Sequence, residues 1–130
     1  KFHFYAQDLI HHAMAFRSFL DAGVPVAAGS DFQPGPFAPL MGIQGMVTRT
    51  GWNGETWGAS QRITVAEALR VNTLNGAHAS HEEAIKGSIS PGKLADFVVL
   101  ADDLHTVAHD KIKDIQIVRT VTGGATVFQA

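Results

Sequence analysis

Asp31 is the residue whose type and position point most directly to chemistry. It follows the short apolar run Val24–Ala28, which predicts a buried strand. In parallel α/β folds the carboxyl ends of the strands carry the active site. A carboxylate there can bind a metal ion or take a proton from a metal-bound water. The alternative is structural, because an aspartate can also cap a turn through its own backbone.

Histidines are the second group of candidate metal ligands. His78 and His81 are three residues apart and share one face of a predicted helix, a spacing that can hold zinc. No third ligand has an obvious spacing, however, and Glu82 and Glu83 indicate a solvated helix end. The other histidines that we considered offer no ligand set: His11, His12, His105 and His109.

Other catalytic patterns are absent from the sequence. Gly29-Ser30-Asp31 lacks the second glycine that the nucleophile turn of a strand-to-helix hydrolase needs. There is no phosphate-binding loop and no dinucleotide fingerprint. A catalytic zinc needs about three protein ligands, and this sequence offers one convincing candidate.

Composition limits the classes of protein to which the chain can belong. Its 130 residues are 45% hydrophobic and 17% charged, which fits one domain with a real core and excludes a disordered tail. No apolar run approaches the roughly 20 residues of a membrane span. A net charge of −2 without a basic stripe argues against nucleic acid. The absence of cysteine excludes disulfide scaffolds and fits the cytoplasmic location that we expect. The chain lacks a starting Met, which is consistent with a start inside a longer protein.

The elements predicted up to residue 86 alternate between helix and strand. Apolar spacing predicts a helix over Asp8–Ala22, ended by Gly23, before the strand Val24–Ala28. The proline-rich stretch 33–39 predicts a defined loop, and Pro39 the first residue of a helix with Leu40, Ile43 and Val47 on one face. Thr64-Val65-Ala66-Glu67 is a capping box at the start of a third helix, towards Ala79.

From Gly87 onward the sequence changes to strands and turns. Asp96–Leu100 and Ile115–Thr122 are predicted strands, and Gly123-Gly124 a two-residue turn into Ala125–Phe128. We therefore predict an α/β part over residues 1–86 and a β part over residues 87–130.

The polar loop Thr50–Arg62 carries Trp52 and Trp57. One interpretation is a surface loop whose indoles fill a groove. The other is a lid or substrate rim, because long loops in compact domains are often functional.

Several stretches resemble one family of enzymes. Ala22–Asp31 resembles the last barrel strand of the amidohydrolase superfamily. Gly87–Leu100 is similar to its C-terminal signature, where the chain leaves the barrel for a β-sandwich, and Val121–Phe128 to its final hairpin. The stretches 16–21, 39–43 and 47–49 narrow the match to the amidohydrolase 3 branch, which includes N-substituted formamide deformylase-like enzymes.

The resemblance implies a fold and a mechanism. It implies a (β/α)8 barrel with one or two divalent metals, usually zinc, whose bound hydroxide attacks an amide-type carbon. Asp31 stands where the family's aspartate binds metal and shuttles the proton. The implied fold class for this chain is α/β: the last strand and helices of the barrel, then the C-terminal part of the sandwich. The pocket-rim candidates are Phe32, Gln33, Trp52 and Trp57.

The family's His-x-His pair and middle-strand ligands are absent from this chain. We therefore expect a C-terminal portion that is inactive alone and holds no tightly bound metal. The expected partners are a small amide-type substrate in the parent protein, and either a second copy or the N-terminal portion, with no nucleic acid and no membrane. The alternative is a non-catalytic binding or assembly module that reuses the same segment.

Overall fold

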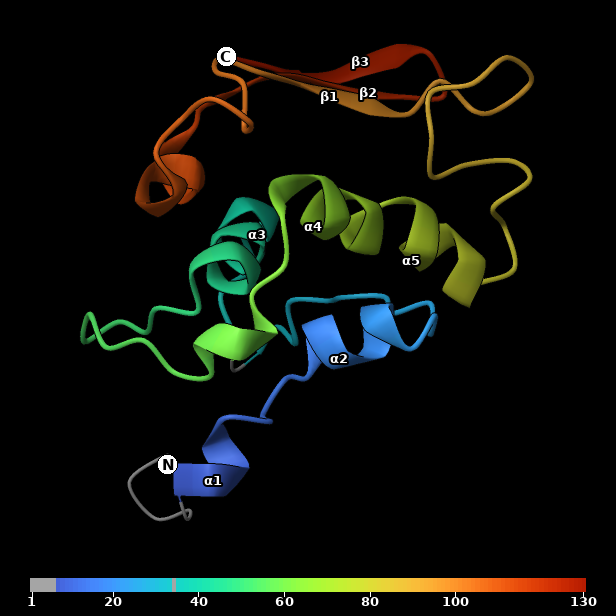
Figure 1. Cartoon of the computed structure of the whole chain (residues 1–130). Coiled ribbons are helices and arrows are strands. Elements are labelled where there is room, and N and C mark those ends of the chain that lie inside the picture. Colours follow the sequence, from blue (N-terminus) through green and yellow to red (C-terminus); the bar gives the residue numbers. More distant parts are fainter. Residues whose placement is uncertain (1–6, 34) are drawn as a thin grey trace.

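The computed structural model describes residues 7–33 and 35–130 of the chain. Helices make up the part before residue 80, and a small sheet lies near the C-terminus (Figure 1). In Figure 1, α4 and α5 lie between α2 and the sheet. The elements in chain order are α1 (Gln7–Ile10), α2 (Phe16–Asp21), α3 (Pro39–Thr48), η2 (Ala59–Gln61), α4 (Val65–Asn72), α5 (Leu74–Ala79), β1 (Phe97–Leu100), η3 (His109–Asp114), β2 (Ile117–Thr122) and β3 (Ala125–Gln129).

The helix predicted over Asp8–Ala22 is interrupted between α1 and α2. Met14 has a φ of 52°, outside the helical region. The Arg49 side chain donates to the carbonyls of Ala13 at 2.6 Å and Met14 at 3.3 Å. The Met14 carbonyl also accepts from the Phe16 N–H at 2.8 Å, so the chain makes a tight turn here instead of a helical turn.

The predicted stop at Gly23 is confirmed. Gly23 has a φ of 73°, which glycine adopts without steric cost. Its N–H donates to Leu20, and the Val24 N–H donates to Phe19 at 2.9 Å. These two bonds form a Schellman motif that satisfies the last carbonyls of α2.

The strand predicted over Val24–Ala28 is wrong for this chain. The segment is irregular, and every strand that the structure describes lies after residue 96. A strand needs the backbone groups of a neighbour to complete its ladder. Here the neighbour is helical: the Ala28 N–H donates to the carbonyl of Val71 at 3.3 Å. The apolar run is therefore bound to helices instead of entering a sheet.

α3 and α4 begin as the sequence predicts. Pro39 occupies the first turn of α3, and Ile43 and Val47 face the core with Leu40 packed beside them. The capping box of Thr64 and Glu67 forms with both of its hydrogen bonds. The helix expected to reach Ala79 is divided at Thr73, whose backbone (φ −122°, ψ −87°) separates α4 from α5.

The C-terminal sheet has the strand order β1-β2-β3, and both pairs are antiparallel. Its three strands agree with the prediction, although β2 begins at Ile117 instead of Ile115. Gly123 and Gly124 have φ values of 57° and 81°, as a type I′ hairpin turn requires. The mixed α and β content is thus as expected, while the barrel and sandwich assignments stay predictions.

The core joins α3 and α4 to η3, which belongs to the connection between β1 and β2. Ile112 of η3 and Val71 of α4 are fully buried. This single cluster includes residues on both sides of the boundary predicted near residue 86, and the two-part division remains a prediction. The buried members are Ile43, Met46, Val47, Ile63, Val65, Ala68, Val71, Leu104, Ile112 and Ile115.

Candidate functional site

Asp31 begins the loop that leads from the irregular segment 24–28 to α3. Its side chain is exposed and its φ is 50°, a left-handed conformation that aspartate tolerates better than most residues. The Gly35 N–H donates to the Asp31 carbonyl at 3.1 Å. A Cβ at Gly35 would lie 2.2 Å from the Ser30 carbonyl oxygen, so the loop folds closely onto the backbone beside Asp31.

The Asp31 side chain does not close this turn. Over residues 7–33 and 35–130, its carboxylate makes no hydrogen bond or ion pair, and the turn uses its carbonyl instead. Because the Asp31 backbone carbonyl closes the turn, the structural alternative stays open. The metal and catalytic roles of Asp31 stay predictions.

Two aromatic rings follow Asp31 along the loop. Phe32 and Phe37 pack edge to face, with ring centroids 5.6 Å apart and planes at 75°. The two side chains are 60% and 74% exposed, and Gln33 between them is also exposed. Sequence reasoning named Phe32 and Gln33 as rim candidates but missed Phe37. The signal that could have found it is an aromatic residue within a proline-rich loop that follows the candidate ligand.

Trp52 and Trp57 belong to an ordered loop after α3. A bridge between Thr50 and Thr56 closes it, and the Trp57 N–H donates to the Arg49 carbonyl at 2.9 Å. Trp52 is 88% exposed, so its indole does not fill a groove, whereas Trp57 is half-buried. The rim role of both indoles stays a prediction.

The histidine pair lies at a solvated helix end, as expected. His78 and His81 are both exposed, and their ring centroids are 6.5 Å apart. His78 Nδ1 lies 3.2 Å from Glu83 Oε1. A backbone hydrogen bond and then the contact with His78 lower the pKa of Glu83. Among the described residues, no three His, Cys, Asp or Glu side chains come together to hold a metal ion. The residues described here therefore do not fit a complete metal centre.

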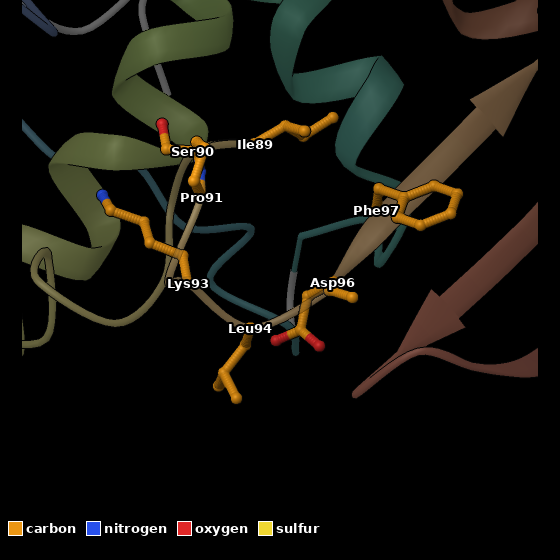
Figure 2. A pocket seen from close by; sticks show the side chains of 8 residues that line it. Ile89, Ser90, Pro91, Lys93, Leu94, Asp96 and Phe97 are labelled. Carbon is orange, nitrogen blue, oxygen red and sulfur yellow. The ribbon is translucent and has the colours of Figure 1, made fainter.

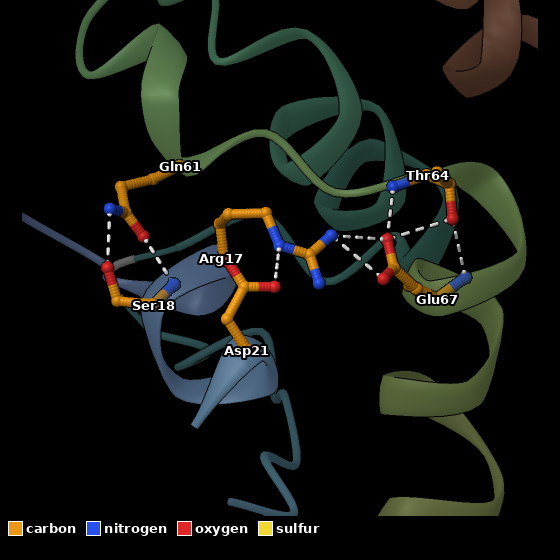
Figure 3. A network of polar contacts seen from close by, with 6 residues as sticks. All are labelled: Arg17, Ser18, Asp21, Gln61, Thr64 and Glu67. Atoms are coloured by element: carbon orange, nitrogen blue, oxygen red, sulfur yellow. Dashed lines mark hydrogen bonds and ion pairs between the residues drawn. The ribbon is translucent and has the colours of Figure 1, made fainter. Parts of the chain in front are cut away.

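A polar network ties α2, which precedes the Asp31 segment, to the start of α4 (Figure 3). Arg17 Nη1 donates to both carboxylate oxygens of Glu67, at 2.8 and 2.9 Å, and its Nε donates to Asp21 at 2.8 Å. Glu67 also accepts from the backbone N–H of Thr64 at 2.8 Å. The Thr64 N–H and then Arg17 lower the pKa of Glu67, so the carboxylate is held ionised.

Two buried amide side chains hold the part of the chain that leads from α2 to Asp31 at two further places. Gln61 accepts from the Ser18 N–H at 3.0 Å and donates to the Ser18 hydroxyl at 2.7 Å, which fixes α2 against η2. Asn75 on α5 donates to the Val26 carbonyl at 2.8 Å. The route to Asp31 is therefore fixed at its entry and in its middle.

A separate cavity of about 380 Å³ lies at the Pro91-Gly92 turn and includes no residue of the Asp31 loop. In Figure 2 the Lys93 side chain extends away from those of Asp96 and Phe97. Lys93 Nζ instead donates to the Ser88 hydroxyl at 2.8 Å. Since the polar groups do not converge on the cavity, its geometry favours no catalytic role.

Comparison with known proteins assigns the chain to a family. The profile of the amidohydrolase family matches residues 4–128. The chain belongs to the amidohydrolase family. It is 35% identical over 113 residues to the N-substituted formamide deformylase of Arthrobacter pascens, an alignment that covers 87% of this chain and 21% of the deformylase.

A second curated relative and one solved structure also match the chain. The chain is 34% identical over 91 residues to the imidazolonepropionase of Geobacillus thermodenitrificans, covering 70% of this chain and 20% of that protein. Its fold matches E. coli guanine deaminase with a TM-score of 0.65 at 24% identity, over 95% of this chain and 32% of that one. The chain thus spans about a fifth of the length of the curated relatives it matches.

None of the helices in the described parts, residues 7–33 and 35–130, combines the length and apolar character required to cross a bilayer.

Proposed function

We propose that this chain is part of a metal-dependent hydrolase that acts on carbon–nitrogen bonds other than peptide bonds. The observation that carries the proposal is the match of the amidohydrolase family to residues 4–128. The similarity to a protein named N-substituted formamide deformylase supports a small amide-type substrate.

Within this activity, Asp31 is the proposed metal ligand and general base. Its exposed carboxylate, free of partners among the described residues, supports this role because it leaves the oxygens available for a ligand or a proton. When bound, a divalent metal, which we propose to be zinc, would supply an activated water. Since the described residues do not complete a metal centre, the remaining ligands are proposed to lie outside residues 7–33 and 35–130.

The decisive variant is Asp31→Asn in a protein that carries this chain together with the remaining length of its relatives. The amide keeps the shape but cannot accept the proton, so kcat should fall by about 100- to 10,000-fold. Asp102→Asn, at an exposed carboxylate far along the chain, is the matched control and should leave kcat unchanged. A near-normal kcat for Asp31→Asn would refute its role. Absence of turnover by the zinc-loaded unsubstituted protein would favour the non-catalytic binding or assembly module.

For the isolated chain, we propose that it is inactive, retains no zinc after dialysis, and associates through its sheet. Apolar side chains on β1 to β3 that are 36% to 63% exposed support this association: Phe97, Val98, Val99, Ile117, Val118, Val127 and Phe128. Exposed apolar patches of this kind mark interaction surfaces.

Light scattering on the purified chain should show either self-association or binding to the N-terminal portion when that is added. Stoichiometric zinc by elemental analysis, or a monomer that melts cooperatively at high concentration and ignores the N-terminal portion, contradicts these proposals.

A further inference from the structure

Asn75 is a buried polar residue in the first turn of α5, two residues after Thr73. Its side chain is 7% exposed. Burying an amide side chain is unfavourable unless its polar atoms are hydrogen-bonded. Asn75 Nδ2 donates to the carbonyl oxygen of Val26 at 2.8 Å, across 49 positions of sequence. The amide thus connects α5 to the segment that precedes Asp31.

The hydrogen bond from Asn75 to Val26 matters because residues 24–28 are not part of a sheet and are not held by bonds to a neighbouring strand. Residues 24–28 belong to no strand, and besides the bond from Val24 to α2, two hydrogen bonds join them to α4 and α5. One is the Asn75 bond to Val26, and the other runs from the Ala28 N–H to the Val71 carbonyl at 3.3 Å. Val71 and Asn75 are four residues apart, on either side of the division between α4 and α5.

Asp31 lies three residues after Ala28, so a restraint on the backbone of Ala28 also limits the position of Asp31. A residue spans at most about 3.6 Å of extended chain, so fixing Ala28 restricts the places that Asp31 can reach. The entry to the segment is fixed independently, by Arg17 with Glu67 and by Ser18 with Gln61. Loss of the Asn75 bond would therefore free the middle of the segment while its entry stayed in place.

We propose that Asn75 is a positioning residue for Asp31: its amide holds the backbone of Val26, and through it the carboxylate, at the place where the reaction needs it. This rests on the proposed role of Asp31. The amide itself touches no substrate. It replaces, with one side-chain hydrogen bond, part of the restraint that a neighbouring strand would give.

Asn72 provides a matched control. It is the same residue type one turn earlier, and its Nδ2 donates at 2.8 Å to the carbonyl of Ala68 within its own helix. Asn72→Ala therefore removes a hydrogen bond of the same kind and length without affecting the segment 24–28.

The first experiment measures amide hydrogen exchange in this chain. In Asn75→Ala, exchange of the Ala28 N–H should become roughly three- to tenfold faster, the loss that one buried hydrogen bond represents. Asn75→Leu keeps the volume but loses the donor and adds no charge, so it should show the same effect and decides the result if the alanine variant does not fold. Exchange at Ala28 should be unchanged in Asn72→Ala. Unchanged exchange in both Asn75 variants, or equal acceleration in Asn72→Ala, overturns the proposal.

The second experiment measures kinetics in the longer protein used to test Asp31. A displaced catalytic group affects the chemical step, so Asn75→Ala should lower kcat by up to about 100-fold while KM changes little. Asn75→Gln, which retains the amide on a longer stem, should recover part of the loss, and Asn72→Ala should alter neither constant. If Asp31→Asn loses activity but Asn75→Ala does not, or raises only KM, the positioning role is wrong and the proposed function stands. If Asp31→Asn is fully active, the proposed role of Asp31 fails and the positioning role of Asn75 fails with it, whatever the exchange experiment shows. Absence of turnover by the unsubstituted protein is the result that contradicts the proposed function itself.

Discussion

The helical body, formed by α2 to α5 with η2 and η3, and the C-terminal sheet, formed by β1 to β3, use their apolar residues in opposite ways. In the helical body these side chains converge on one cluster, where Ala68, Val71 and Ile112 are fully buried. In the sheet Val121 is buried, but Val127 is 63% exposed and Phe128 49%. The helical body is therefore stabilised by burial within the chain. The sheet depends more on its hydrogen bonds, on the attachment of η3 to the core, and on any partner that covers it.

The largest expected effect comes from two isoleucines, one in each region. Ile112→Ala, at a site with 0% exposure, should reduce the free energy of unfolding by about 2 to 5 kcal/mol, because the core loses packing and keeps a cavity. Ile117→Ala, at a site that is 36% exposed in β2, should cost about 1 kcal/mol or less. Urea unfolding at low protein concentration measures both. Equal losses of unfolding free energy for the two variants would mean that a partner covers the sheet in solution. The contrast between the helical body and the sheet would then be wrong.

A smaller effect separates the polar contacts of the two regions. Thr64→Ala removes the cap of α4 and should cost about 1 kcal/mol, and Thr64→Ser should restore most of it. In the sheet, Asp96 Oδ1 accepts from the Gly123 N–H at 2.6 Å but is exposed to water. Asp96→Ala should therefore cost about 0.5 kcal/mol, the low end for a hydrogen bond. If thermal melts show a larger loss of stability for Asp96→Ala than for Thr64→Ala, the expected order of the two effects is wrong.

The smallest expected effect is a pH dependence that belongs to the helical body. The pKa of Glu67 is lowered in the folded chain, by the Thr64 N–H first and then by Arg17. Its contribution to stability is therefore fully present above the unfolded pKa, near 4.5, and is lost as the pH falls through the lower folded value. Glu67→Gln should show a shallower loss of stability from neutral pH to about pH 3 than the unsubstituted chain. Glu55→Gln, at an exposed site outside this network, should keep the original slope, and identical slopes for all three proteins would contradict the assignment.

Structural features that depend on hydrogen bonds between neighbouring residues could be predicted from the sequence. The capping box of Thr64 and Glu67, the start of α3 at Pro39, the stop at Gly23 and the turn at Gly123-Gly124 all depend on bonds within a few residues. Each is set by local backbone chemistry, which the sequence displays directly.

Features decided by distant residues were not predictable. The interruption of the first helix depends on Arg49, and the irregular course of residues 24–28 depends on Val71 and Asn75. An apolar run with two valines has the composition of a strand, but the backbone partner decides whether a strand forms. At the candidate site, Asp31 follows this irregular run instead of a strand, and its metal and catalytic roles stay predictions. The packing of Phe37 on Phe32 was not predictable, because it depends on how the intervening loop folds back.

The position of η3 has a consequence for the order in which the sheet assembles. β2 and β3 are joined by a two-residue turn, and hairpins of this kind close within about 1 to 10 μs. β1 joins β2 only after the connection that contains η3 has closed, and the entropy of that longer loop opposes pairing. Burial of Ile112 among the helices offsets this entropy, since it shortens the free chain that remains to be closed. We therefore expect the hairpin to form early and β1 to dock late, and Ile112→Ala to slow the docking step in stopped-flow refolding. The attachment of η3 to the helical body therefore favours the docking of β1 onto β2.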